Sequence, residues 1–154
     1  MTRGFTIVEL LIYMVIMSTL LTVLGGVLIT ILDVQTESQS TSVVEADGRF
    51  LLARLSYDLH RANSLTTPAA AGQTTTSLGL TIGGQTYTYA VANSILQLTT
   101  PSDTSPLTSP DEAVTNFSVT RLGNPGGIPT VQINFTISHG QETRNYQTAG
   151  GLRH

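Results

Sequence analysis

The order of apolar and polar residues divides the chain into an N-terminal apolar segment, a polar stretch and a C-terminal region of alternating residues. The apolar segment contains 23 consecutive uncharged residues, from Leu10 to Leu32. As an α-helix they span roughly 35 Å, which is enough to cross a bilayer. Between Arg3 and Asp33 the one charged residue is Glu9. A carboxylate in such surroundings is costly in lipid and needs a chemical reason.

The helix is predicted to continue beyond the apolar segment. Residues 33–42 are polar, but they contain neither Gly nor Pro. Apolar residues then recur at spacings of 7, 4, 4 and 3 on one helix face, at Val44, Leu51, Leu55, Leu59 and Ala62. We therefore expect one helix from Phe5 to about Arg61, which is apolar all round at first and amphipathic later.

Gly25 and Gly26 lie inside the predicted apolar helix, where two glycines cost roughly 2 kcal/mol relative to alanine. Two interpretations remain open. Glycine permits close packing between membrane helices. Alternatively, the pair is a point at which the helix unwinds.

The rest of the chain predicts an antiparallel β-region. A small polar loop is expected over 62–77, and the segment 99–112, with three prolines, is expected to be irregular. Strands are expected where apolar residues alternate, with turns at Gly83-Gly84, Asn93-Ser94, residues 123–127 and His139-Gly140. The expected strands are 78–82, 86–91, 95–98, 114–122, 130–138 and a weak last strand near 142–148.

These elements predict an α+β fold. The amphipathic half of the helix, around Val44–Ala62, is the one predicted element that can cover the apolar face of the sheet. The expected organisation is therefore an apolar helix up to residue 32, its amphipathic continuation over 33–62 and a β-rich globular domain over 63–154.

Composition excludes several classes of function. The net charge is −3, the chain has no lysine, and its seven arginines are scattered, so no basic patch for nucleic acid is predicted. There is no cysteine, so the domain is not expected to depend on disulfides.

No motif for catalysis or for a cofactor occurs in the sequence. The three histidines, His60, His139 and His154, are far apart and are expected on the surface. Asp103, Asp111 and Glu112 lie in one loop, but their spacing matches no calcium motif. We therefore expect no enzyme, no cofactor and no metal site.

The N-terminus has three possible interpretations. A cleaved signal peptide has a shorter apolar core and a small-x-small cleavage site, and neither is present here. A signal anchor fits the hydropathy, with Arg3 on the cytoplasmic side and Asp33 and Glu37 outside, but leaves Glu9 unexplained.

The third interpretation is a resemblance. The stretch Gly4-Phe5-Thr6-Ile7-Val8-Glu9-Leu10-Leu11-Ile12 resembles the processing motif of type IV pilins and type II secretion pseudopilins. The resemblance implies that a prepilin peptidase removes a leader of residues 1–4 by cutting between Gly4 and Phe5, and that Phe5 is then N-methylated. Residues 5–32 would form the transmembrane and assembly helix of a pilin-like fold, and Gly25-Gly26 would be a candidate helix break.

The resemblance also gives Glu9 a role. Cleavage creates a cationic amine on Phe5, which can pair with Glu9 of an adjacent subunit and neutralise both charges. The pair would hold the two subunits at one axial offset. The alternative is that Glu9 reaches the lipid headgroups from an inert anchor.

A second, shorter resemblance, over Phe50–Leu59, is to the helix end of J-type minor pseudopilins. Together they imply a structural, minor subunit of a type IV pilus-like or type II secretion pseudopilus filament. Its partners would be other pilin or pseudopilin subunits, prepilin peptidase and the inner-membrane assembly platform. The protein would cross the inner membrane once, N-terminus in, before it joins an extracytoplasmic filament. The competing hypothesis is an extracytoplasmic binding domain or enzyme on an N-in anchor.

Overall fold

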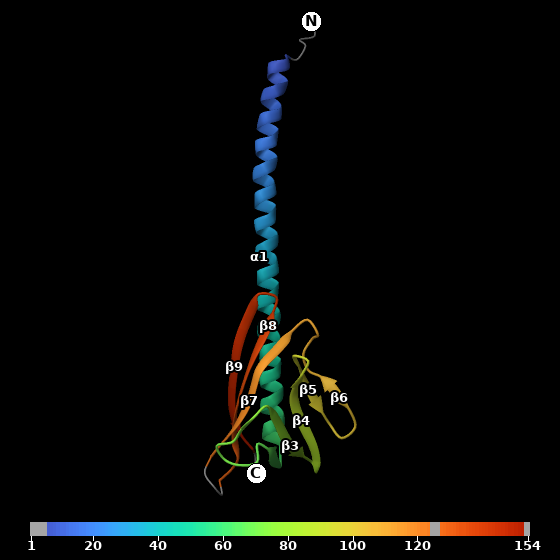
Figure 1. The fold of residues 1–154 in the computed structure, drawn as a ribbon, viewed down its shortest axis with the longest axis vertical. Coiled ribbons are helices and arrows are strands. Elements are labelled where there is room, and N and C mark those ends of the chain that lie inside the picture. Colours follow the sequence, from blue (N-terminus) through green and yellow to red (C-terminus); the bar gives the residue numbers. More distant parts are fainter. Residues whose placement is uncertain (1–5, 124–126, 153–154) are drawn as a thin grey trace. The chain divides into compact units, whose positions relative to one another are not determined.

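The computed structural model describes residues 6–123 and 127–152 (Figure 1). The chain forms two units, Met1–Gln39 and Ser40–His154. Its elements are helix α1 (Ile7–Arg61) and strands β1 (Ser64–Thr67), β2 (Thr74–Thr75), β3 (Ser77–Ile82), β4 (Gln85–Ala92), β5 (Ile95–Thr99), β6 (Thr104–Pro106), β7 (Ala113–Leu122), β8 (Thr130–His139) and β9 (Glu142–Gly151). The predicted single long helix and the α+β fold class are confirmed.

The strands belong to two antiparallel sheets. The five-stranded sheet has the order β1-β3-β4-β5-β6, and the four-stranded sheet has the order β2-β7-β8-β9. The sequence predicted one antiparallel sheet, whereas the strands divide between two. That division is set by pairing between distant segments, and the apolar periodicity of one segment does not reveal which strand it pairs with.

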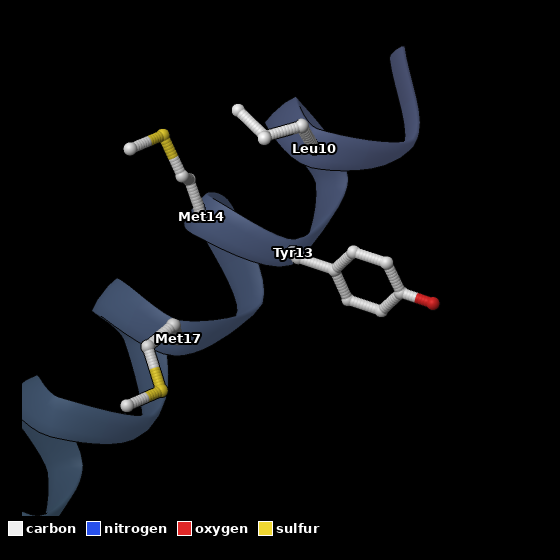
Figure 2. A pocket seen from close by; sticks show the side chains of 4 residues that line it. All are labelled: Leu10, Tyr13, Met14 and Met17. Carbon is white, nitrogen blue, oxygen red and sulfur yellow. The ribbon is translucent and has the colours of Figure 1, made fainter. Parts of the chain in front are cut away.

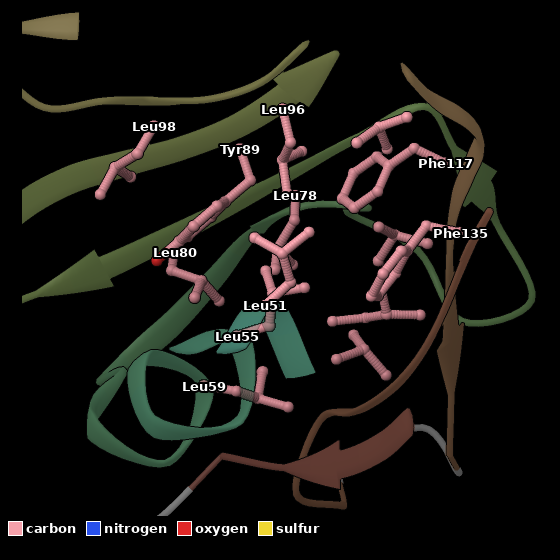
Figure 3. Close-up of a cluster of buried hydrophobic side chains, with 14 of the residues drawn as sticks. Leu51, Leu55, Leu59, Leu78, Leu80, Tyr89, Leu96, Leu98, Phe117 and Phe135 are labelled. Atoms are coloured by element: carbon pink, nitrogen blue, oxygen red, sulfur yellow. The ribbon is translucent and has the colours of Figure 1, made fainter. Parts of the chain in front are cut away.

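Both sheets pack against the second half of α1, within the unit Ser40–His154. The helix face that was predicted from its spacing is buried, with Val44, Leu51 and Leu55 fully covered and Leu59 1% exposed. Leucine and aromatic side chains of both sheets complete the core around this face (Figure 3). Apolar burial at roughly 25 cal/mol per Å² makes this packing the main stabilising term.

A polar contact connects α1 to the five-stranded sheet. Asp58 is 1% exposed on the helix, and the hydroxyl of Tyr89 on β4 donates a hydrogen bond to its carboxylate. Arg54 Nε lies 2.9 Å from the same carboxylate oxygen. Burial raises the pKa of Tyr89, and the hydrogen bond to Asp58 adds to this shift, so the phenol stays protonated as a donor. The buried charge of Asp58 is therefore paired, as a buried carboxylate requires.

Most predicted strands and turns are found. The β3–β4 hairpin turns at Gly83 (φ 59°) and Gly84 (φ 81°), as the predicted primed turn requires, and the turn at Asn93-Ser94 also has positive φ angles. The last strand, β9, reaches Gly151 and is longer than predicted. The turn predicted at residues 123–127 lies partly outside the described residues.

Two predictions of irregular structure were wrong. The expected loop over 62–77 contains β1 and β2, and the expected irregular segment 99–112 contains β6. All three strands are short and rich in Ser and Thr, so they carry little apolar alternation. Each pairs with a longer neighbouring strand, and that tertiary pairing overrides weak local preference.

Candidate functional site: the N-terminal helix

The start of α1 is fixed by a side-chain cap. Thr6 directly precedes the helix, and its hydroxyl oxygen accepts a hydrogen bond from the backbone N–H of Glu9 at 3.3 Å. The carbonyl of Thr6 accepts the N–H of Leu10 at 3.2 Å. Thr6 is therefore the N-cap, and Thr6-Ile7-Val8-Glu9 has the Thr-x-x-Glu spacing of a capping box. This role of Thr6 was not predicted, although its spacing to Glu9 in the sequence signals it.

Glu9 lies in the first turn of α1 and is exposed. Its carboxylate there is favoured by the partial positive charge of a helix N-terminus. The ion pairs found in the described part of the chain do not include Glu9. Gly4 and Phe5, the predicted cleavage and methylation residues, lie outside the described residues.

The first part of α1 exposes an apolar surface on all sides. Its large apolar side chains, from Ile7 to Val34, are between 49% and 81% exposed. Among the described residues, α1 is the one helix long and apolar enough to cross a membrane. A surface of this extent requires lipid or other protein around it.

Hydroxyl groups within this part of the helix are satisfied by the helix itself. Thr19, Thr22 and Thr30 donate to the backbone carbonyl four residues earlier at 2.8–3.0 Å, and Ser18 donates to the carbonyl of Val15 at 3.1 Å. These bonds let a hydroxyl lie in an apolar environment without an unpaired donor. The helix can therefore carry these polar residues into lipid or into a helix bundle.

Two different surfaces run along the apolar part of α1. Small residues recur every fourth position, at Ser18, Thr22, Gly26 and Thr30, and form one narrow line. Bulky side chains on another part of the surface line an open apolar hollow, at Leu10, Tyr13, Met14 and Met17 (Figure 2). At 100° per residue, the bulky line continues through Leu24 and Leu28, roughly opposite Gly26. A line of small residues allows a second helix to approach closely, and the bulky line of that second helix can pack against it.

Gly25 and Gly26 are part of continuous helix. A Cβ added at either position would meet nothing within 4 Å. In the described chain neither glycine is required by an internal contact. Both earlier interpretations, close packing and unwinding, therefore concern events outside the single subunit.

The remaining chemical candidates in the described residues are Asp103, Asp111, Glu112, His60 and His139, while His154 lies outside them. No group of three His, Asp or Glu side chains able to hold a metal occurs within residues 6–123 and 127–152. Asp103 accepts a hydrogen bond from Ser105 in an exposed turn. The ring Nδ1 of His139 contacts the carbonyl of Asp111 at 3.2 Å, and His60 is exposed on α1. Glu112 is buried in the domain.

Comparison with known proteins finds one match. Residues 1–25 match the family described as the prokaryotic N-terminal methylation motif. The match covers Gly4, Phe5 and Glu9 as well as Gly25. Neither a curated protein nor a solved structure matches the chain.

Proposed function

We propose that this chain, which carries the N-terminal methylation motif over residues 1–25, is a pilin-like protein and a minor structural subunit of a type IV pilus-like or type II secretion pseudopilus filament. The observation that carries the proposal is the exposed apolar surface of α1 directly behind that motif. Such a helix is anchored in the membrane. In a filament it would exchange lipid for the helices of neighbouring subunits.

Maturation would precede assembly. The motif implies processing by prepilin peptidase. We propose the cut between Gly4 and Phe5, so that residues 1–4 are the leader and Phe5 carries the new, methylated amine. With Arg3 on the inner side, the helix would cross the inner membrane once, and the domain over 63–154 would lie outside the cytoplasm.

Glu9 would then set the axial position of each incoming subunit. Its carboxylate lies at the N-terminal end of the helix, where the cleaved amine of a neighbour can approach. In an apolar bundle, a carboxylate and an amine are far less costly as a pair than apart. Only one axial offset brings the two groups together, so the pair would select one packing register.

The two surfaces of α1 suggest how many copies of a pilin helix could follow one another. The line of small residues through Thr22 and Gly26 differs in shape from the bulky line through Met17 and Leu24. When the small-residue line of one helix packs on the bulky line of another, the two helices together still have one free small-residue line and one free bulky line. Repetition of such a contact builds an open helical filament when the rotation does not close.

The test is the chemical identity of the mature N-terminus. We expect mass spectrometry of the protein isolated from its native membrane to find a chain that begins with methylated Phe5. A Gly4→Leu variant should retain residues 1–4, because the residue before the cut is altered. An intact Met1 in the natural chain, or a cut at another bond, would contradict the filament proposal and favour an anchored binding domain or enzyme.

A further inference from the structure

A buried carboxyl group lies where the four-stranded sheet meets α1. Glu112 directly precedes β7 and is 3% exposed. Its Oε2 atom is buried and has no hydrogen-bond partner within the described chain. An ionised carboxylate in this position would be costly, because its charge is neither solvated nor paired.

The group that faces Glu112 is another acid. Asp47, half-buried on α1, lies within hydrogen-bonding reach of the Glu112 carboxyl. Asp111 adds a further negative charge from the same turn, whereas a hydrogen bond with the backbone of Ser109 favours the ionised form. Burial, followed by the Asp47 carboxyl, raises the pKa of Glu112 to about 7.

No cation within the described residues neutralises this pair. Arg49, two positions after Asp47, has its guanidinium 3.6 Å from Glu45, and Arg144 pairs with the same glutamate at 3.0 Å. Arg54 pairs with Asp58. His139, at the end of β8, contacts the backbone carbonyl of Asp111 through its ring nitrogen. The Glu112 carboxyl therefore interacts with the Asp47 carboxyl, and the ion pairs of the described residues include neither acid.

Neither carboxyl can easily move away. The turn that carries Glu112 is fixed by the bond from Leu107 N–H to Leu96 O at 2.8 Å and by the buried Thr108. After Glu112, the N–H of Val114 donates to Ser94 O at 2.7 Å. Asp47 precedes the buried Gly48 on α1. Two acids held together in this way can relieve their repulsion by binding a proton.

We propose that Glu112 keeps its proton at neutral pH, and that its protonated carboxyl, hydrogen-bonded to the Asp47 side chain, fastens the start of β7 to α1. Loss of the proton leaves two like charges at a buried junction and loosens the domain. Because the folded state holds this proton more tightly than the unfolded chain, the stabilisation is complete at pH values below the ordinary pKa of glutamate. It is lost as the pH rises through about 7. This proposal is independent of the filament proposal.

The test is thermal unfolding of the full-length protein in detergent micelles, followed by circular dichroism between about pH 5.5 and pH 8.5. The wild-type midpoint should fall by about 5 °C or more across this range. Glu112→Gln removes the titrating group and keeps its shape, so its midpoint should change little. Asp111→Asn, the neighbouring control, should fall like the wild type. A flat wild-type profile, or an equal fall in Glu112→Gln, would overturn the proposal.

A second measurement does not depend on the glutamine variant folding. Carbon-13 NMR of the glutamate carboxyls should show one group titrating near pH 7, and Asp47→Asn should lower its midpoint by at least about one pH unit. If the glutamate carboxyl with the highest titration midpoint titrated near the ordinary pKa of glutamate, the proposal would be overturned. Recovery of the wild-type melting temperature at alkaline pH on addition of calcium would also overturn it, because the pair would then be a cation site.

Discussion

The aromatic ring of Tyr146, on β9, lies directly against the backbone of Gly48 on α1. Gly48 is buried, and a Cβ at this position would overlap the ring. The Tyr146 hydroxyl donates a 2.8 Å hydrogen bond to the carbonyl of Val44, one turn earlier. Its ring also stacks on Phe135 of β8, with the ring centroids 5.4 Å apart. Gly48 thus allows the four-stranded sheet to approach the helix closely.

Gly48→Ala should therefore destabilise the domain, although alanine is the better helix former. The methyl group would have to displace the Tyr146 ring, and such overpacking costs typically 1–3 kcal/mol, which outweighs the gain of up to about 1 kcal/mol in helix propensity. Thermal unfolding measures the change. Gly25→Ala is the matched control, because its Cβ would meet nothing within 4 Å and should not lower the midpoint.

A double variant separates the clash from other effects at Gly48. Tyr146→Ala removes the ring, so adding Gly48→Ala to it should cost little more. A Gly48→Ala penalty that is the same with and without the Tyr146 ring would refute the steric explanation.

Tyr89→Phe should also destabilise the domain, for an electrostatic reason. The variant keeps the ring in the core and removes the hydroxyl that donates to Asp58. A hydrogen bond to a buried charged group contributes roughly 1.5–3 kcal/mol. Denaturant unfolding of Tyr89→Phe should show a loss in this range. Tyr57→Phe is the control, because Tyr57 is 55% exposed, and a loss as large as that of Tyr89→Phe would count against the Asp58 contact.

Much of the fold could be predicted because its signals are local. The buried line through Leu51 and Leu55 was visible as a helical spacing, and strand β8 as strict alternation through Ile133 and Phe135. The contacts that join the elements were not visible. Tyr146 and the carbonyl of Val44 lie 102 positions apart, and nothing in either neighbourhood indicates the other. The same holds for Asp47 and Glu112, whose proximity exists only in the folded chain.

In the candidate site, too, local features could be predicted from the sequence and contacts with distant groups could not. Glu9 could be singled out because a lone charge beside an apolar run is locally anomalous, and Thr6 could have been found from its spacing to Glu9. The partner of Glu9 could not be predicted from periodicity, because it would be an amine that cleavage creates and that another subunit carries. Only the resemblance of the N-terminal motif supplied that partner.

The two interpretations of Gly25 and Gly26 predict different outcomes for two variants. If the glycines serve close packing, Gly26→Ala should assemble almost normally and Gly26→Leu should not, because only leucine fills the small-residue line. If they serve unwinding, the double variant Gly25→Ala, Gly26→Ala should already impair assembly, since it removes about 2 kcal/mol of helix destabilisation. Recovery of the protein in sheared surface filaments, relative to the membrane fraction, measures assembly. Leu28→Met, on the opposite surface, is the control that should assemble normally.

Glu9→Leu should separate maturation from assembly. The substitution leaves Gly4 and Phe5 unchanged, so mass spectrometry should still find the mature N-terminus. Incorporation into filaments should fall by at least about tenfold, because the amine of a neighbour would be buried without its counter-charge. Glu9→Gln should fail similarly, since it keeps the size of the side chain but not its charge, whereas Glu37→Gln removes a carboxylate beyond the apolar segment and should leave incorporation unchanged. Normal incorporation of Glu9→Leu would show that Glu9 is only an exposed residue of a membrane anchor.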